Sequence, residues 1–248
     1  VEETTKATAK VIAKEPAVFC GKVWAEETIF QVDPEIRTEW QFEDGEEVAS
    51  GEILVTLDGK ARSILTAERT MLNFMQFLSA VATKTRYLAE KIKHTNSQLL
   101  DTRKTIPGLR LAQKYAVKIG GGQNHRIGLF DAFLIKENHI KAAGGIPNAI
   151  KKAKKVNNSA RIEIEVETLD ELKEALECEP DWILLDNFSI SEMMRAVEIA
   201  KQKVKLEASG GISDVNSLLE IAKTGVDFIS MGDLTKNIQA IDMSLLLD

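Results

Sequence analysis

Residues 99–141 read LLDTRKTIPGLRLAQKYAVKIGGGQNHRIGLFDAFLIKENHIK, and this stretch decides the predicted fold. Apolar runs at 99–103, about 117–121 and 132–137 are typical of strands, and a helical pattern fills 107–116. Further strands are predicted at 162–167, 182–187, 205–209 and 228–231, and further helices near 140–156, 169–178, 189–203, 213–224 and 233–240. Strands that alternate with helices are typical of parallel βα units. Seven such units predict an α/β barrel, in which chemistry gathers at the carboxyl ends of the strands.

Positive charge is concentrated in this stretch. Residues 101–141 hold eight Lys and Arg residues against three acids, whereas the whole chain carries a net charge of −6. Arg103 and Lys104 end one apolar run, Lys136 ends another, and Arg126 follows a turn of three glycines. A charge that closes a buried strand is costly unless it is paired or bound to a ligand. The pattern therefore predicts an anionic ligand, whereas Lys114 and Lys118, four apart on a helix, are interpreted as solvated.

The segment RIEIEVE, residues 161–167, alternates apolar and acidic side chains, so its carboxylates share one face of the predicted strand. Helices must cover the apolar face, which turns the acidic face toward the barrel interior. Glu165 lies near the end of this strand, and Asp186 closes the next one. Two carboxylates on neighbouring strand ends, across from a basic segment, favour Mg²⁺ held together with a phosphorylated substrate.

Glycine-containing turns close the last two predicted strands. The segments are ASGGI at 208–212 and SMGD at 230–233, and each precedes a predicted helix. Glycine lets backbone N–H groups approach a phosphate at a helix N-terminus, the usual phosphate site in barrels of this kind. The residues predicted to surround that phosphate are Ser209, Gly210, Gly211, Ser230, Met231 and Gly232.

Residues 1–98 predict a smaller, β-rich domain followed by a long helix. Short strands are expected at 9–13, 18–21, 39–42 and 53–57, with turns at 44–45 and 58–59. The helix is predicted from 67 to 93, with Thr66 as its N-cap. Arg69 would then lie in the first helical turn, where the helix dipole disfavours a cation, which suggests a role beyond helix stability. The barrel domain is predicted at 99–240.

The bulk composition excludes several classes of protein. With 28% charged and 44% hydrophobic residues, the chain reads as a soluble globular protein, and no apolar run approaches the roughly 20 residues that span a bilayer. A pI near 5.3 argues against nucleic acid as a partner. Cys20 and Cys178 stand far apart, which argues against a thiolate metal site and fits a reducing compartment. We expect a cytoplasmic protein with no membrane partner.

Seven segments together resemble the quinolinate phosphoribosyltransferase family. They are ERTMLNFMQFLSAVAT (68–83), DTRKTIPGLR (101–110), GGGQNHRIGLFDAFLIKENHI (120–140), IEVET (164–168), LLDN (184–187), ASGGI (208–212) and SMGDLT (230–235). The resemblance implies an incomplete TIM-like β/α barrel with a smaller N-terminal α+β domain, to whose sheet the tail 241–248 returns. It also implies a decarboxylating pentosyltransferase that converts quinolinate and phosphoribosyl pyrophosphate to nicotinate mononucleotide, pyrophosphate and CO₂ in de novo NAD biosynthesis. Family members carry a short segment ahead of Val1, and we expect one here.

The resemblance also implies roles for individual residues. Those that would bind quinolinate are Arg69, Arg103, His125, Arg126 and Lys136, and Thr102 would also bind substrate. Lys104 would meet phosphoribosyl pyrophosphate and, with Glu165 and Asp186, would be catalytic; Mg²⁺ would be held near the two acids, directly or through water. The family forms two-fold dimers, so we expect a homodimer, or a hexamer built from dimers, with active sites shared between subunits. Arg69 would then reach the barrel of the partner subunit.

Two alternatives remain open at the level of sequence. A related transferase of molybdate-transport operons, acting on a different anionic acid, shares the TRKT and HR motifs, but Lys136, Asn138 and His139 argue against it. A non-catalytic anion-binding barrel would keep the basic segment but would have no need of Glu165 and Asp186.

Overall fold

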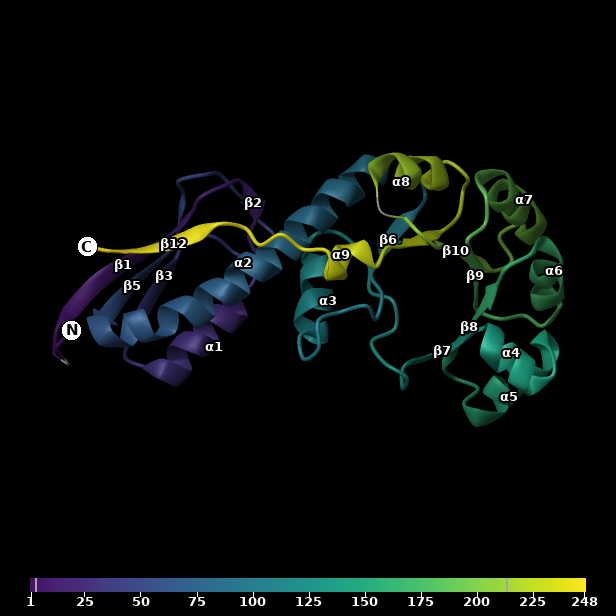
Figure 1. The fold of residues 1–248 in the computed structure, drawn as a ribbon, viewed down its shortest axis with the longest axis horizontal. Helices are drawn as coiled ribbons and strands as arrows, with labels where there is room; N and C mark the ends of the chain where they lie inside the picture. Colours follow the sequence, from purple (N-terminus) through teal and green to yellow (C-terminus); the bar gives the residue numbers. More distant parts are fainter. Residues whose placement is uncertain (3, 213) are drawn as a thin grey trace. The chain divides into compact units, whose positions relative to one another are not determined.

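The computed structural model describes residues 1–2, 4–212 and 214–248, which form two compact units (Figure 1). The first unit comprises residues 1–87, 111–121 and 237–248, and the second, here called the barrel unit, comprises 88–110 and 122–236. This division differs from the expected one, because the boundary falls inside a long helix and residues 111–121 belong to the first unit.

The first unit is built on a four-stranded antiparallel sheet in the order β12-β1-β5-β3. Its strands are β1 (Lys6–Ala13), β3 (Arg37–Trp40), β5 (Ile53–Lys60) and β12 (Met243–Leu247). The C-terminal strand β12 pairs with β1, from Ala9 opposite Leu247 to Ala13 opposite Met243. Two short strands, β2 (Ala17–Val18) and β4 (Glu47–Val48), pair separately. The expected turn at 58–59 is wrong, because β5 runs through it and pairs with β1 as far as Lys60.

The helices of the first unit are α1 (Lys22–Val32), most of α2 (Ala61–Ile92) and nearly all of α3 (Arg110–Ile119). Met71, Leu72 and Met75 of α2 are buried in the core of the first unit together with β1 and β5 side chains such as Val11 and Leu57. Full burial of an apolar side chain of this size contributes about 1.5–3 kcal/mol, so this face of α2 is a main source of the unit's stability.

Several expectations for these helices are wrong. Helix α2 begins at Ala61, and Thr66 lies inside it with its hydroxyl donating to the carbonyl of Arg62, so Thr66 is not the N-cap. Arg69 therefore lies well past the first turn, and the argument from the helix dipole fails. The strand expected at 117–121 is wrong as well, because α3 continues to Ile119. Lys114 on α3 is buried and not solvated, although Lys118 is exposed.

The barrel unit contains six parallel strands in the order β6-β11-β10-β9-β8-β7. They are β6 (Gln98–Leu100), β7 (Ala132–Ile135), β8 (Arg161–Val166), β9 (Trp182–Asp186), β10 (Lys205–Ser209) and β11 (Phe228–Ser230). An isolated bridge between Leu100 and Gln123 continues the pairing past β6. The fold is therefore the expected incomplete β/α barrel with a smaller N-terminal domain.

Helices connect successive strands and lie along the outer face of the sheet (Figure 1). They are α4 (Glu137–Ala143), α5 (Ile146–Val156), α6 (Leu169–Glu177), α7 (Ile190–Ala200), α8 (Val215–Ala222) and α9 (Asp233–Lys236). The helix expected at 140–156 is two helices, because Gly144 and Gly145 adopt positive φ between them. Residue 213, the first of the helix expected at 213–224, lies outside the described residues. No helix within the described ranges is long and apolar enough to cross a membrane.

Candidate active site

The strand register turns a row of acidic side chains into the barrel. On β8, Ile162, Ile164 and Val166 are buried on the face toward the helices, so Glu163 and Glu165 face inward. Leu184 pairs with both Glu165 and Glu207 in the parallel sheet, and Asp186 follows two residues later on the same face. Four carboxylates thus share the barrel interior. The inward orientation expected for the 161–167 strand is confirmed.

Two arginines carry unpaired charge beside these acids. Arg126 is only 7% exposed, and burial followed by the nearby charge of Arg103 lowers its pKa. Within the described residues, no carboxylate lies at ion-pair distance from either guanidinium. Two guanidinium groups that repel each other, one of them buried, destabilise the folded protein when no anion is bound. The arrangement suits an anion that can accept hydrogen bonds from both forks.

Lys136 directly follows β7, where the sequence predicted a cation at the end of a strand. Its Nζ forms an ion pair with Glu165 on the neighbouring strand β8. The lysine side chain is 47% exposed and the glutamate 12% exposed, so the pair lies at the edge of the barrel interior. An exposed ion pair contributes little to stability. Lys136 can therefore exchange this partner for a ligand at small cost.

The segment after β6 meets the segment after β11. A Cβ placed on Gly232 would lie 2.9 Å from Cδ of Lys104 and 3.6 Å from Oγ1 of Thr102. Thr235 donates its hydroxyl hydrogen bond to the carbonyl of Lys104 at 2.9 Å. Glycine at 232 thus lets the Lys104 side chain pass close over the backbone. The structure brings together the two motifs that the sequence placed on different strands.

Asp186 and the glycine turn after β10 are also in contact. The side chain of Asn187 donates to Asp186 at 2.9 Å, and its backbone N–H donates to the carbonyl of Ser209 at 3.0 Å. Gly210 has φ of +111°, and a Cβ there would lie 2.2 Å from Oδ1 of Asn187. Any larger residue at 210 would displace Asn187, which holds Asp186.

The phosphate site expected at helix N-termini is only partly supported. Asp214 caps α8 and accepts hydrogen bonds from the backbone N–H groups of Asn216 and Ser217, so these donors are already used. Helix α9 has only four residues, which gives it little dipole. Any phosphate here would be bound by the turns themselves, at 209–211 and 231–232. Within the second turn Met231 is buried, and Ser230, just before it, hydrogen-bonds Glu207 inside the barrel.

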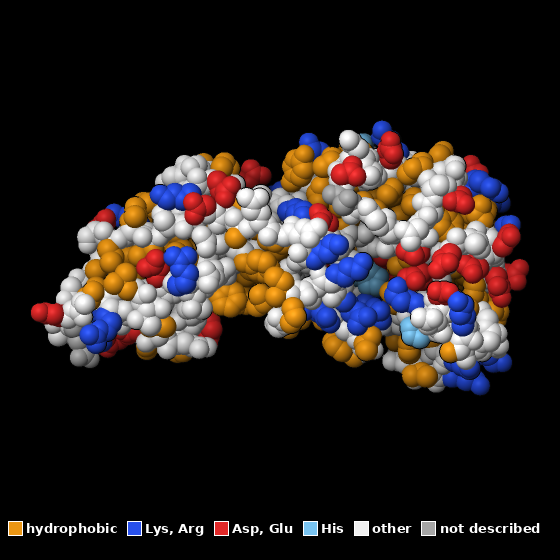
Figure 2. All heavy atoms as spheres, in the orientation of Figure 1, with side chains coloured by type: hydrophobic (Ala, Val, Ile, Leu, Met, Phe, Trp, Pro, Cys, Tyr) orange, Lys and Arg blue, Asp and Glu red, His pale blue; other side chains and the backbone are white. Residues whose placement is uncertain are grey.

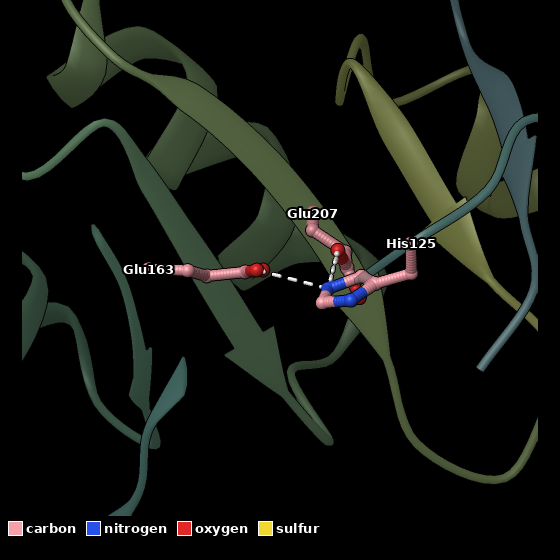
Figure 3. Close-up of side chains that lie close together, drawn as sticks. All are labelled: His125, Glu163 and Glu207. Carbon is pink, nitrogen blue, oxygen red and sulfur yellow. Dashed lines mark ion pairs between the residues drawn. The ribbon is translucent and has the colours of Figure 1, made fainter. Parts of the chain in front are cut away.

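His125 lies inside the barrel between Glu163 of β8 and Glu207 of β10 (Figure 3). Its Nε2 is 2.9 Å from Oε2 of Glu163 and 3.2 Å from Oε2 of Glu207, and all three residues are buried. We call this set the buried histidine cluster. Its ligand-type atoms lie within 4.8 Å of one another, so it is also the one group of three metal-ligating residues found in the described part of the chain.

The protonation of this cluster follows from its contacts. Hydrogen bonds to Glu163 and Glu207 favour a proton on Nε2 of His125 and act to raise the pKa of the ring, whereas burial acts to lower it. A second ring proton, however, would have to sit on Nδ1, which already accepts the N–H of Arg126 at 2.7 Å. We therefore assign a neutral ring that carries its proton on Nε2. Burial and the charge of Glu207 raise the pKa of Glu163 to about 7, so its carboxyl group is only partly ionised at neutral pH.

Glu207 had no role in the expectation from sequence, and Glu163 was only one of three acids on its strand. The alternation of KLEAS at 205–209 could have placed Glu207 in the interior, as the alternation of 161–167 did for Glu163. Behind this cluster, Trp182 stacks on Phe228 at 4.2 Å, and the guanidinium of Arg161 lies 4.0 Å from the Trp182 ring. These residues begin their strands, so the charged groups above lie toward the carboxyl ends.

The last predicted residue, Arg69, belongs to the first unit. It is exposed on α2, 3.8 Å from Glu68. The barrel unit on its own therefore groups the other predicted cations with the acids. Figure 2 shows Lys and Arg side chains gathered on one face of this unit beside a band of Asp and Glu side chains. A surface of this kind suits a substrate that carries negative charge together with a cationic reacting centre.

Comparison with known proteins covers the whole chain. The family model "Quinolinate phosphoribosyl transferase, N-terminal domain" matches residues 1–79, and "Quinolinate phosphoribosyl transferase, C-terminal domain" matches residues 81–246. The nicotinate-nucleotide pyrophosphorylase [carboxylating] of Mycobacterium leprae is 40% identical over 247 residues, covering 97% of this chain and 86% of that protein. A probable enzyme of the same name from Bacillus subtilis is 38% identical over 96% of this chain and 82% of its own length. The structure of the nicotinate-nucleotide pyrophosphorylase from Francisella tularensis superposes with a TM-score of 0.97 and 53% identity, covering 100% of this chain and 88% of that one.

Proposed function

The chain belongs to the quinolinate phosphoribosyltransferase family, and on this premise we propose that it transfers the phosphoribosyl group of phosphoribosyl pyrophosphate to quinolinate. The products are nicotinate mononucleotide, pyrophosphate and CO₂, and the reaction belongs to de novo NAD biosynthesis. The observation that supports this best within the chain is the buried Arg126 beside Arg103, with no carboxylate partner for either among the described residues. Quinolinate, a pyridine with two adjacent carboxylates, would supply the missing negative charge.

The remaining groups suit the second substrate. Lys104, which passes over Gly232, and the turns at 209–211 and 231–232 are proposed to bind the phosphates of phosphoribosyl pyrophosphate. Arg103, Arg126 and Lys136 are proposed to orient quinolinate, with the guanidinium forks providing geometric selectivity. Thr102, whose hydroxyl accepts the N–H of Lys104 at 3.0 Å, would hold the segment between the two substrates.

The chemistry needs positioning and charge stabilisation more than a reactive side chain. The pyridine nitrogen attacks the anomeric carbon while the bond from that carbon to pyrophosphate breaks, and pyrophosphate leaves with the electron pair. Glu165 and Asp186 would stabilise the positive charge that develops on the anomeric carbon. The ribosylated ring is then a cation, so the bond to the adjacent carboxylate can break. CO₂ leaves, the electron pair stays on the ring carbon, and a proton replaces the lost group.

Mg²⁺ is a proposed cofactor, and the donor set fits it. Glu165 and Asp186 offer oxygen ligands on the same face of neighbouring strands, which is the chemistry that Mg²⁺ prefers when it also binds substrate phosphates. When bound there it would neutralise charge on the departing pyrophosphate. Glu165 already forms an ion pair with Lys136, so Asp186 is the carboxylate more readily available to Mg²⁺.

A shared dimer and a cytoplasmic location are part of the same proposal. Arg69 belongs to the first unit and is exposed, which leaves it available to a partner subunit in a homodimer or in a hexamer built from dimers. Both cysteines are free, in keeping with a reducing compartment. Neither the shared dimer nor the cytoplasmic location depends on which reaction the protein catalyses.

A direct assay tests the reaction. Purified protein would be incubated with quinolinate, labelled with ¹³C in the 2-carboxylate, together with phosphoribosyl pyrophosphate and Mg²⁺. Mass spectrometry should detect nicotinate mononucleotide and labelled CO₂ in equal amounts, and neither should form without phosphoribosyl pyrophosphate. Folded protein that binds quinolinate without turnover would instead favour a non-catalytic barrel. Turnover of another anionic acid in preference to quinolinate would favour the related transferase.

A further inference from the structure

We infer that Glu163 and Glu207 are positioning residues that hold the His125 ring and, through it, the backbone of Arg126 in the place where that arginine meets quinolinate. The inference concerns residues to which neither the motifs nor the comparisons assign a role. It rests on the proposed function for its kinetic test, and on geometry alone for its structural test.

Each polar atom of the His125 side chain already has a protein partner. Nδ1 accepts the backbone N–H of Arg126 at 2.7 Å, and Nε2 faces the two carboxylates at 2.9 and 3.2 Å. The ring therefore has no nitrogen left to contact a substrate carboxylate. The role expected for His125 as a quinolinate ligand gives way, in this inference, to a role in placing its neighbour.

The same residue ties two cationic segments together. The backbone N–H of His125 donates to Oδ1 of Asp101 at 2.9 Å, and Asp101 directly precedes the segment 102–104. Backbone hydrogen bonds between Gln123 and β6 reinforce this link, with Gln123 donating to Leu99 and accepting from Asp101. A shift of the ring would thus move Arg126 relative to Arg103. Misplacement by about 1 Å can reduce catalysis about a hundredfold.

The two glutamates hold the His125 ring in one orientation. Glu163 is fully buried, and its carboxyl group contacts His125 and also hydrogen-bonds Glu207. Glu207 is 1% exposed and also accepts from Ser230. A buried carboxyl group loses part of its compensation if the histidine that it contacts turns away. The ring is therefore held from one side by the carboxylates and from the other by the Arg126 N–H.

The kinetic test uses Glu207→Gln, with Glu167→Gln as the matched control. Glu167 directly follows β8 and is exposed, so Glu167→Gln makes the same chemical change away from the cluster. Glu207→Gln should raise the KM for quinolinate by about tenfold or more while the KM for phosphoribosyl pyrophosphate changes by less than about twofold. Glu167→Gln should leave both unchanged. Equal losses for both substrates, or a lower melting temperature with unchanged KM values, would show a purely structural role and overturn the inference.

A double-mutant cycle separates positioning from direct contact. If Glu207 acts through His125, the double variant His125→Ala/Glu207→Gln should be no slower than His125→Ala alone. The first substitution has then already removed the interaction between the two side chains. If His125 binds substrate independently, the two effects should multiply, which would refute the inference. Glu163→Gln with His125→Ala gives the same comparison should Glu207→Gln fail to fold.

A structural readout works even if the protein has no activity on quinolinate. The ¹⁵N chemical shifts of the His125 ring in the wild-type protein should show a proton on Nε2 and none on Nδ1, and the Glu207→Gln variant should change the Nε2 signal. A proton on Nδ1, or a metal ion bound stoichiometrically in the purified protein and lost in Glu163→Gln, would overturn the assignment. Failure of the proposed function alone would leave this expected spectrum unchanged.

Discussion

The charge of Arg103 lowers the pKa of Arg126, which burial has already lowered, and no carboxylate among the described residues pairs with either guanidinium. Like charges held together in the free protein destabilise it, and an anion that binds both removes the repulsion. The free energy of this repulsion is thus converted into affinity for a dianion when substrate binds.

The first prediction concerns Arg103 and Lys136. Each substitution to alanine should remove a charge-assisted hydrogen bond to quinolinate worth about 1.5–3 kcal/mol, which is about a ten- to hundredfold loss in kcat/KM. Because Arg103→Ala also removes a repulsion, its melting temperature should not fall. Lys118→Ala, which removes an exposed cation, is the control. Wild-type kinetics in a folded Arg103→Ala protein would remove this residue from the site.

The second prediction concerns the second carboxylate of the substrate. Nicotinate lacks it, so at least one cation of the pair would remain unpaired when nicotinate binds. We expect its kcat/KM to fall by about a hundredfold or more relative to quinolinate, although the mononucleotide product would be the same. Steady-state kinetics with both acids would measure this. Comparable efficiencies would assign the protein to another acid.

The third prediction concerns Gly232. A methyl group at this position would lie 2.9 Å from Cδ of Lys104, at a flexible part of that side chain. Gly232→Ala should therefore fold normally but push Lys104 aside, so the KM for phosphoribosyl pyrophosphate should rise by about tenfold while that for quinolinate stays near its wild-type value. The opposite pattern would place Lys104 with the other substrate.

The fourth prediction is a dependence of stability on pH. The folded pKa of Glu163 is raised to about 7, above the value of 4.5 for an exposed glutamate, so the folded state binds more protons between these values. This contribution is fully present below about pH 4.5 and is lost as the pH rises through 7. Relative to Glu163→Gln, the wild-type protein should lose on the order of 3 kcal/mol between pH 5 and pH 8. If thermal unfolding of the wild-type protein and of Glu163→Gln changed equally between pH 5 and pH 8, the result would contradict the raised pKa.

The fifth prediction concerns the proposed shared site. If Arg69 enters the site of the partner subunit, Arg69→Ala and Arg103→Ala proteins should each be nearly inactive. Refolding them together makes about half of the dimers mixed, each with one intact site in two, so activity should return to about a quarter of wild type. Mass spectrometry would confirm the mixed dimers. Mixed dimers without activity would place Arg69 in the site of its own chain or in none.

The order of strands and helices and the charges at strand ends could be read from the sequence because both follow local rules. Alternation placed Glu165 and Asp186 on the inner face, and apolar runs placed Arg103 and Lys136 at strand ends. Helix α1 was missed because Val23 and Phe30 are exposed, so its apolar residues do not mark one face. The cluster around His125 was missed because proximity across a barrel depends on strand order.

Strand β9 is hydrogen-bonded to neighbours on both sides, whereas Gln123 has one backbone hydrogen bond to Leu99 of β6 and one from Asp101, directly after that strand. Local opening costs least where the fewest bonds must break, so the edge of the sheet at Gln123 should open more readily than the strand pairs around β9. Arg103 follows β6, and Arg126 follows Gln123. A single dianion bound by both arginines would therefore add a link between the two segments to the few hydrogen bonds that already join them, and the substrate would strengthen this edge of the sheet.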